Sequence, residues 1–421
     1  MKDRFPVSFL LISAVWLSYL SAQALEVTGV AARQRWPWNN LVDIDFTVVT
    51  NGTESSAGFV IDVVGTFSNG VRKVAASTFT TSAEVQAGTN RVTWNLGADY
   101  PGMRLSDLTL TVSASPLQTY LVIDLSSGPS ATSYPVRYTA VPPDLANDAC
   151  RTDELWLRRV AAGSFTMGSP TGEVGRTANE TPHTVTLTKG FYIGVFEVTQ
   201  QQWYHVTGQK PSYYNNANCW ATRPVENISY NTIRGSTDGA NWPASSTVDA
   251  TSFIGKLRAR SGLASLDLPT EAQWEYACRA GTTTALNNGA NITSTTSDPS
   301  LGCLARYKYS GGYLENGTVQ PSQSVGDINA TAKVGSYPPN AWDLYDMHGN
   351  VWEKCLDWFT GNLGTAGVAD PVGAASATAG RSSRGGGCWD NAEYCRSAMR
   401  LISAPNSAHP RQGLRLVVER P

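Results

Sequence analysis

The sequence is poor in charge, in histidine and in closely spaced cysteines, and each shortage excludes a class of function. Charged residues make up only 16% of the 421 residues, and 32 Lys and Arg are balanced by 34 Asp and Glu. A chain without a basic excess has no field that attracts nucleic acid, so no nucleic-acid partner is expected. The seven cysteines include no CxxC pair, which argues against a structural zinc knot.

Common catalytic signatures are missing as well. The four histidines form no HxxxH pair with a following acid, and no GxSxG elbow of a serine hydrolase occurs. The run Gly385-Gly386-Gly387 is followed by Cys388 and not by the lysine of a phosphate-binding loop. The usual hydrolase and nucleotide-binding classes are therefore not encoded in a recognisable form.

The first residues, MKDRFPVSFLLISAVWLSYLSAQALE, have the parts of a secretory signal peptide. A charged start and an apolar stretch precede the small-x-small triplet Ala22-Gln23-Ala24, so residues 1–24 are expected to be removed. An uncleaved membrane anchor is the alternative. No later stretch is apolar enough to span a bilayer, so no integral membrane segment is expected after cleavage. A secreted, periplasmic or cell-surface protein is expected, in which disulfides can form.

Residues 25–140 are strand-like throughout, with Gly, Asn, Asp and Ser between seven short runs. The last two runs are Thr119–Ser126 and Tyr134–Ala140. Short strands at even spacing without a helical pattern predict an all-β, immunoglobulin-like sandwich. No catalytic constellation lies in it, so a spacer or adhesive role is favoured. Residues 141–153, which contain two consecutive prolines, are predicted to be a linker.

Residues 154–421 change character, because helix signals appear among short strands and long Gly/Ser/Thr/Asn loops. Three helices are predicted, each from a polar cap residue and a terminating glycine. The caps are Thr199, Asp249 and Thr270, and the terminators are Gly208, Gly262 and Gly281.

Eight segments of this region occur in a collinear series: SFTMGSP (164–170), FEVTQQQW (196–203), RPVENISY (223–230), LPTEAQWEYACRAG (268–281), PNAWDLYDMHGNVWEKCLDWF (339–359), RGGGCWDN (384–391), CRSAMR (395–400) and GLRLV (413–417). The series closely resembles the formylglycine-generating enzyme family, also called the sulfatase-modifying factor family. The resemblance implies that residues 154–421 form an α+β, loop-rich domain related to C-type lectins.

The founding activity of that family is the oxidation of a client sulfatase cysteine to formylglycine by dioxygen. It uses two copper(I)-binding cysteines, which are separated by four residues and lie just after a Gly-Gly-Ser. In this chain Gly387 replaces the serine, and six residues separate Cys388 from Cys395. These two are the candidate catalytic residues if a thiolate pair is rebuilt. A disulfide or buried thiols are favoured over that reading, and Cys355 is another candidate partner for Cys395.

The segment DMHGNVWE suggests a structural calcium site. Asp346 and Glu353 supply two carboxylates on either side of Gly349, which permits a tight turn with exposed carbonyls. The resemblance assigns the ligands as the side chains of Asp346 and Glu353 and the backbone oxygens of Gly349 and Val351. A carboxylate-capped turn without metal is the alternative.

Three functions are compatible with these residues, and whether the chain is an enzyme stays open. The favoured one is a calcium-stabilised member of the family that binds a peptide, protein or glycan ligand, with Trp389, Asp390 and Tyr394 as ligand-binding residues. The alternatives are a divergent copper-dependent oxidase and a structural surface protein. Arg400 and Arg415 match arginines of the family's C-terminal motif and are expected to be internal struts that hold loop carbonyls.

Overall fold

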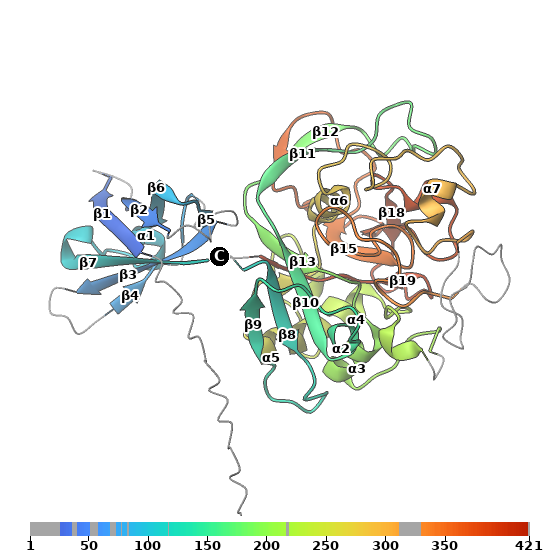
Figure 1. The fold of residues 1–421 in the computed structure, drawn as a ribbon, viewed down its shortest axis with the longest axis horizontal. Coiled ribbons are helices and arrows are strands. Elements are labelled where there is room, and N and C mark those ends of the chain that lie inside the picture. Colours follow the sequence, from blue (N-terminus) through green and yellow to red (C-terminus); the bar gives the residue numbers. More distant parts are fainter. Residues whose placement is uncertain are drawn as a thin grey trace, which may run out of the picture. The chain divides into compact units, whose positions relative to one another are not determined.

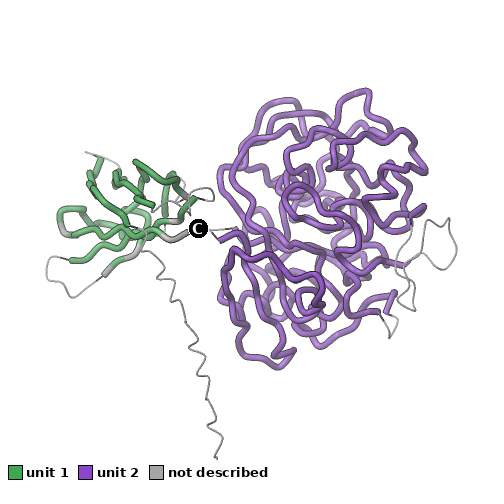
Figure 2. The backbone as a smooth tube through the Cα atoms, viewed as in Figure 1, with its two compact units in different colours: residues 1–117 green, residues 118–421 purple. Residues whose placement is uncertain are grey.

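The computed structural model describes residues 26–35, 40–50, 58–67, 73–76, 78–81, 84–116, 118–215, 219–310 and 330–419. The chain divides into two compact units, residues 1–117 and 118–421, which Figure 2 shows in different colours. The expected signal peptide, residues 1–24, lies outside the described residues. In the ranges that are described, no helix has both the length and the apolar character needed to cross a membrane.

The first unit consists of two antiparallel sheets (Figure 1). One has the order β1-β2-β6, and in the other β3 pairs with β4, β5 and β7. Its strands are β1 (Glu26–Gln34), β2 (Leu41–Val49), β3 (Phe59–Phe67), β4 (Lys73–Ala75), β5 (Glu84–Val85), β6 (Gly88–Asn95) and β7 (Leu108–Pro116), and its helices are α1 (Leu96–Asp99) and the 3-10 helix η1 (Leu105–Asp107).

Both sheets contribute to one hydrophobic core. Along β2 the alternate residues Val42, Ile44, Phe46 and Val48 are buried, as the period of two of a strand with one buried face requires. Ile61 and other residues of β3 belong to the same cluster. The expected β-rich unit is therefore present, while its immunoglobulin-like topology stays a prediction.

The division between the units differs from the expected linker at 141–153. The last two runs assigned to the sandwich are β8 (Tyr120–Asp124) and β9 (Val136–Thr139), and both belong to the second unit. There β8 pairs with β10 (Glu154–Val160), which comes after the expected linker. A strand pattern shows that a segment is extended but does not show which sheet it joins, and that is why the boundary falls at residue 117 instead.

The second unit is built on one six-stranded sheet and two smaller sheets (Figure 1). The strand orders are β14-β20-β13-β10-β8-β9, β18-β17-β15-β19 and β11-β12-β16. The further strands are β11 (Gly163–Met167), β12 (His183–Leu187), β13 (Phe191–Gly194), β14 (Leu266–Asp267), β15 (Trp352–Trp358), β16 (Val368–Ala369), β17 (Arg381–Arg384), β18 (Leu401–Ser403), β19 (Gln412–Gly413) and β20 (Val417–Glu419).

Short helices and long loops complete this unit, as expected for a loop-rich α+β domain. The helices are α2 (Ala149–Thr152), α3 (Gln200–Thr207), α4 (Tyr230–Arg234), α5 (Phe253–Ser261), α6 (Glu271–Arg279) and α7 (Pro299–Gly302), with the 3-10 helices η2 (Trp220–Thr222), η3 (Gly239–Asn241) and η4 (Ala392–Cys395).

Two of the predicted helix caps are confirmed. Thr199 and Thr270 each form a full capping box, because the glutamine three residues later bonds back to the cap. The predicted cap Asp249 is wrong. Ser252 caps α5 by accepting from the backbone N–H of Gly255 at 3.0 Å, while the Asp249 carboxylate accepts backbone N–H groups of the preceding loop.

The termini of these helices show the same mixture. Gly208 and Gly262 end α3 and α5 in the left-handed conformation, as predicted. The C-cap of α6 is Ala280, with a φ of 45°, one residue before the predicted Gly281. The cores of the unit are apolar, and in one of them Trp203 of α3 stacks on Phe253 of α5 with ring centroids 4.4 Å apart.

Candidate functional site

The candidate site lies on the loop that follows β17. Gly385 and Gly386 have φ angles of 98° and 77°, which favour glycine. A Cβ on Gly386 would lie 2.6 Å from the Cys395 Sγ, so only glycine lets the loop pack against that thiol. The segment Gly385-Gly386-Gly387 therefore packs closely against Cys395.

Arg384 anchors the start of this loop. Its guanidinium donates from Nη1 to the carbonyls of Ser397 and Met399 at 3.0 and 3.2 Å. Its Nη2 bonds to a Glu275 carboxylate oxygen of α6 at 2.7 Å. In Figure 1, α6 lies beside β15, in agreement with the contacts of α6 with β15 and β17. The loop is thus held at both ends by one fully buried cation.

The two candidate catalytic cysteines are enclosed. The side chains of Cys388 and Cys395 are both 0% exposed. Burial raises the pKa of the Cys388 thiol to about 12, and burial together with the nearby Asp390 raises the pKa of the Cys395 thiol well above its ordinary value. Both groups are therefore thiols, and not thiolates, at neutral pH.

The seven cysteines, all of which lie in the described ranges, form no disulfide in the structure. Cys388 and Cys395 are close enough that the charge of one would raise the pKa of the other. Cys355, the other partner considered for Cys395, is a fully buried thiol on β15.

His348 holds the Cys395 segment through its backbone carbonyl. Its Nδ1 lies 2.6 Å from the Cys395 carbonyl oxygen and donates to it, and its Nε2 accepts from the Asn287 backbone N–H at 3.0 Å. Burial lowers the pKa of the ring to about 4, so the histidine is neutral. Its two nitrogens are both used, which makes it a positioning residue.

Next to the buried thiols the surface is aromatic. Trp389 is 42% exposed and Tyr213 is 64% exposed. Tyr214 lies between them, with ring centroids 5.1 Å from Tyr213 and 6.2 Å from Trp389, both edge-on. We call Tyr213, Tyr214 and Trp389 the ring ladder. Tyr394 is 36% exposed but has no ring contact with the ladder among the residues described.

Asp390 forms the polar border of the ring ladder. One of its carboxylate oxygens pairs with Arg411 Nη1 at 2.5 Å, and the other accepts from Trp352 Nε1 at 2.7 Å and from the Gly387 N–H at 3.0 Å. The Arg411 guanidinium lies 5.8 Å from the centre of the Trp389 ring. The structure thus places Arg411 and the two tyrosines beside Trp389 and Asp390, whose role in ligand binding stays a prediction.

The predicted calcium ligands lie in a buried group of carboxylates. Asp346, Glu353 and Glu197 are all buried around Arg415. Burial, the largest cause, and the neighbouring carboxylates raise the pKa of Glu197. The pKa of Asp346 is raised to about 6, chiefly by burial. Arg151 is a second guanidinium that acts on Asp346, so three acids face two cations.

The individual oxygens test whether a cation fits there. Asp346 Oδ2 accepts from the Gly335 N–H at 2.6 Å, while its Oδ1 is buried and has no hydrogen-bond partner. Glu353, in contrast, accepts from the Arg415 Nη2 at 2.7 Å and from the Trp274 Nε1 at 2.7 Å. Asp346 thus has an oxygen available for calcium, whereas the Glu353 oxygens already have donors. No group of three or more His, Cys, Asp or Glu side chains in the described ranges is arranged to hold a metal ion.

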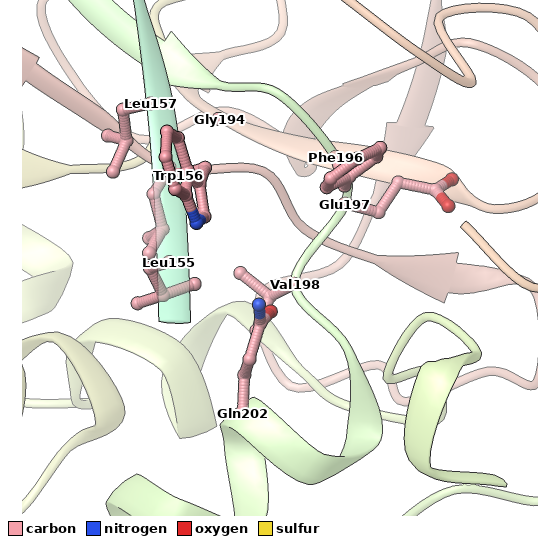
Figure 3. A pocket seen from close by; sticks show the side chains of 9 residues that line it. Leu155, Trp156, Leu157, Gly194, Phe196, Glu197, Val198 and Gln202 are labelled. Atoms are coloured by element: carbon pink, nitrogen blue, oxygen red, sulfur yellow. The ribbon is translucent and has the colours of Figure 1, made fainter. Parts of the chain in front are cut away.

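Glu197 was missed by the sequence analysis. It is a lone acid directly after the apolar run of β13, which is the signal that marks it in retrospect. Its carboxylate accepts from Asn350 Nδ2 at 2.5 Å and from the Val351 N–H at 3.1 Å. Figure 3 shows that this carboxylate points away from the small apolar pocket whose lining includes Leu155 and Trp156. Glu197 therefore lines the pocket with the inner part of its side chain, while its carboxylate belongs to the carboxylate group.

The prediction that Arg400 and Arg415 are internal struts is confirmed. Arg400 donates to the carbonyls of Asn179 and Thr360 at 2.9 and 2.8 Å. Arg415 donates to the carbonyls of Gly194 and Tyr345, each at 2.8 Å. Each guanidinium is buried and joins segments that are far apart in the sequence.

The fold and the collinear motifs define a loop-rich α+β domain of the sulfatase-modifying factor type. The model of the "Sulfatase-modifying factor enzyme 1-like domain" matches residues 144–420. Because the match covers more than half of the chain, the protein belongs to this family.

Several characterised members are similar in sequence. The formylglycine-generating enzyme of Mus musculus is 31% identical over 159 residues, which are 36% of this chain and 39% of that enzyme. The formylglycine-generating enzyme of Thermomonospora curvata is 32% identical over 161 residues, which are 36% of this chain and 49% of that enzyme. The matches thus span less than half of those enzymes.

Two solved structures are similar to part of this chain. Treponema denticola variable protein 1 has a TM-score of 0.48 and 27% identity, over 64% of this chain and 96% of that one. PvdO from Pseudomonas aeruginosa has a TM-score of 0.47 and 24% identity, over 63% of this chain and 94% of that one.

Proposed function

We propose that the second unit is a binding module of the sulfatase-modifying factor family, which holds a peptide, protein or glycan ligand against the ring ladder and the Asp390–Arg411 pair. The observation that carries this proposal is a contrast in exposure. Trp389 is 42% exposed, whereas the adjacent Cys388 and the Cys395 thiol are 0% exposed. The loop thus presents an aromatic surface to solvent and keeps its sulfur atoms inside.

The buried thiols fit a copper ion poorly in this arrangement. Copper(I) prefers thiolate ligands, and burial raises the pKa of both thiols, so copper binding would have to release two protons in an enclosed site. Gly386 also packs directly on the Cys395 Sγ. The divergent oxidase is kept as the second candidate because Cys388 and Cys395 lie close enough that a charge on one would raise the pKa of the other. The third candidate, a purely structural surface protein, has no need for the exposed rings.

A copper titration separates the first two candidates. The full chain is titrated with copper(I) against a chromophoric chelator, alongside Cys388→Ser and Cys395→Ser. We expect no tightly bound equivalent that depends on both cysteines. A client peptide with a sulfatase cysteine motif is incubated in parallel and analysed by mass spectrometry, with no conversion to formylglycine expected. One copper equivalent lost in either serine variant, or formylglycine in the peptide, would favour the oxidase.

We also propose that the second unit binds a structural calcium ion at Asp346. The support is the buried Asp346 Oδ1 without a hydrogen-bond partner, near two further carboxylates and only two guanidinium groups, Arg415 and Arg151. The ion would be held by this oxygen with the backbone oxygens of Gly349 and Val351, while Glu353 stays paired with Arg415. A hard divalent cation would supply the missing positive charge.

Thermal unfolding tests the calcium proposal. We expect millimolar calcium to raise the melting temperature of the full chain relative to EDTA, because a ligand of the native state stabilises it. The effect should disappear in Asp346→Asn. The control is Asp238→Asn, since Asp238 is exposed and far along the chain from this turn. Equal melting temperatures with calcium and with EDTA would contradict the calcium proposal. They would show that protonation of these carboxyl groups and the neighbouring arginines balance the charge without a metal ion.

A further inference from the structure

The ring ladder is a group of neighbouring aromatic side chains at the surface. Tyr213 and Trp389 are among its exposed large hydrophobic side chains, and Tyr214 connects them through edge-on contacts. Contiguous exposed aromatic side chains commonly mark a binding site. The two exposed rings, with the partly buried Tyr214 between them, offer apolar surface to a ligand that has apolar faces of its own.

Polar atoms without partners surround the ladder. The Tyr214 hydroxyl, the Glu226 Oε2 and the Arg411 Nε are each buried and lack a hydrogen-bond partner in the described part of the chain. The Glu226 side chain is 0% exposed, and its other oxygen accepts from the Tyr214 N–H at 2.8 Å. Arg411 Nε is a donor, while the Tyr214 hydroxyl and the Glu226 carboxyl, which retains a proton in the folded state below about pH 7, can donate or accept. Hydroxyl groups, which donate and accept at once, complement such a mixture best.

The charges beside the ladder are balanced. Asp390 and Arg411 form an ion pair at 2.5 Å, and the pair lies directly against Trp389 through the guanidinium. Neither sign is in excess here, so a strongly charged ligand would gain little. A carboxylate and a guanidinium side by side can instead accept from and donate to neighbouring hydroxyls of one ligand.

We infer that the ring ladder binds a neutral glycan, with the C–H face of a sugar packed on Trp389 and its hydroxyls bonded to the Asp390–Arg411 pair. The inference rests on the proposed binding function and narrows it to one ligand class. A peptide is the less favoured occupant. A peptide would need an apolar anchor pocket or a free strand edge. The ladder is formed instead by loop residues, the two tyrosines before η2 and Trp389 after β17.

Binding is measured with the full chain and a panel of neutral oligosaccharides of glucose, galactose, mannose and N-acetylglucosamine, by glycan array and then by calorimetry. We expect at least one to bind, with a dissociation constant that changes less than about threefold between 50 and 500 mM NaCl, because no net charge is paired. Trp389→Ala and Tyr213→Ala should each weaken it about tenfold or more, as truncation of an aromatic anchor does.

The matched control is Tyr138→Ala. Tyr138 is 42% exposed, the same fraction as Trp389, and lies on β9 away from the ladder. It should bind the oligosaccharide like the unaltered chain, and all variants should keep the same melting temperature within a few degrees. Equal losses in Tyr138→Ala and Trp389→Ala would contradict the assignment.

These experiments distinguish failure of the glycan inference from failure of the proposed binding function. If no oligosaccharide of the panel binds but a peptide array yields a ligand that Trp389→Ala releases, the glycan inference is wrong and the binding function stands. If neither array yields a ligand sensitive to Trp389→Ala, both are wrong. Binding of charged oligosaccharides alone, with a steep loss in high salt, would also overturn the neutral-glycan inference.

Discussion

The anchor between Glu275 and Arg384 should be one of the costliest contacts to break. Glu275 is 0% exposed and accepts from the Gly168 N–H at 2.8 Å, from Arg279 at 2.7 Å and from Arg384 at 2.7 Å. Glu275→Gln keeps the shape but places an amide where one carboxylate oxygen stood. One guanidinium then faces a donor, and two buried cations share less negative charge.

The magnitude follows from these contacts. Removing one partner of a buried ion pair costs about 3–5 kcal/mol, because the remaining charge is left without compensation. Arg384 keeps an ion pair with Glu271 at 3.0 Å, which places Glu275→Gln toward the lower end of that range. A loss of about 3 kcal/mol lowers the folding equilibrium constant roughly a hundredfold.

Urea unfolding of the full chain, followed by far-UV circular dichroism and tryptophan fluorescence, measures the effect on the second unit. The exposed Asp238→Asn serves as the matched neutralisation, with a change within about 0.5 kcal/mol. Arg384→Met should couple to Glu275→Gln by about 1 kcal/mol or more, since the two side chains share one network. A loss below about 1 kcal/mol in Glu275→Gln, or strict additivity in the double variant, would refute the reasoning.

Three further predictions concern the same unit. Burial raises the pKa of Glu226 from 4.5 to about 7, so between these pH values the folded state retains a proton that the unfolded state releases. The free energy of unfolding should therefore fall by roughly 1–3 kcal/mol as pH rises from 4.5 to above 7. Chemical unfolding of Glu226→Gln should lack this part of the decline. A thiol reagent should react quickly with one cysteine, the exposed Cys303, in the native chain and with all seven in denaturant, whereas a denatured count of five would reveal a disulfide. Gly386→Ala should destabilise by more than about 2 kcal/mol, because it combines a φ of 77° with a Cβ 2.6 Å from the Cys395 Sγ, while Gly361→Ala, which meets nothing within 4 Å, should change the melting temperature little.

Local signals predicted the helices of the second unit well. The capping boxes at Thr199 and Thr270 involve residues three apart, so the sequence contains the whole interaction. Asp249 failed because two acceptable caps, an aspartate and Ser252, stand three residues apart, and only the tertiary contacts of the preceding loop decide between them.

Long-range pairing could not be predicted. The strands β8 and β9 follow the strands of the first unit with no break in the strand-like sequence, and β10, which pairs with β8, begins only at Glu154. The site shows the same limit. Trp389 and Asp390 were predicted from one loop, whereas Tyr214, Glu226 and Arg411 approach them from distant segments with no local pattern that announces a site.

Arg384 grips the loop through main-chain carbonyl groups, those of Ser397 and Met399. Every amino acid has such a carbonyl, so this grip does not depend on which side chains the intervening residues carry. Exposed positions such as Trp389 and Tyr394 can therefore be exchanged without releasing the loop's shape. The same backbone could display a range of chemical surfaces, which makes this segment a natural place to diversify recognition by mutagenesis.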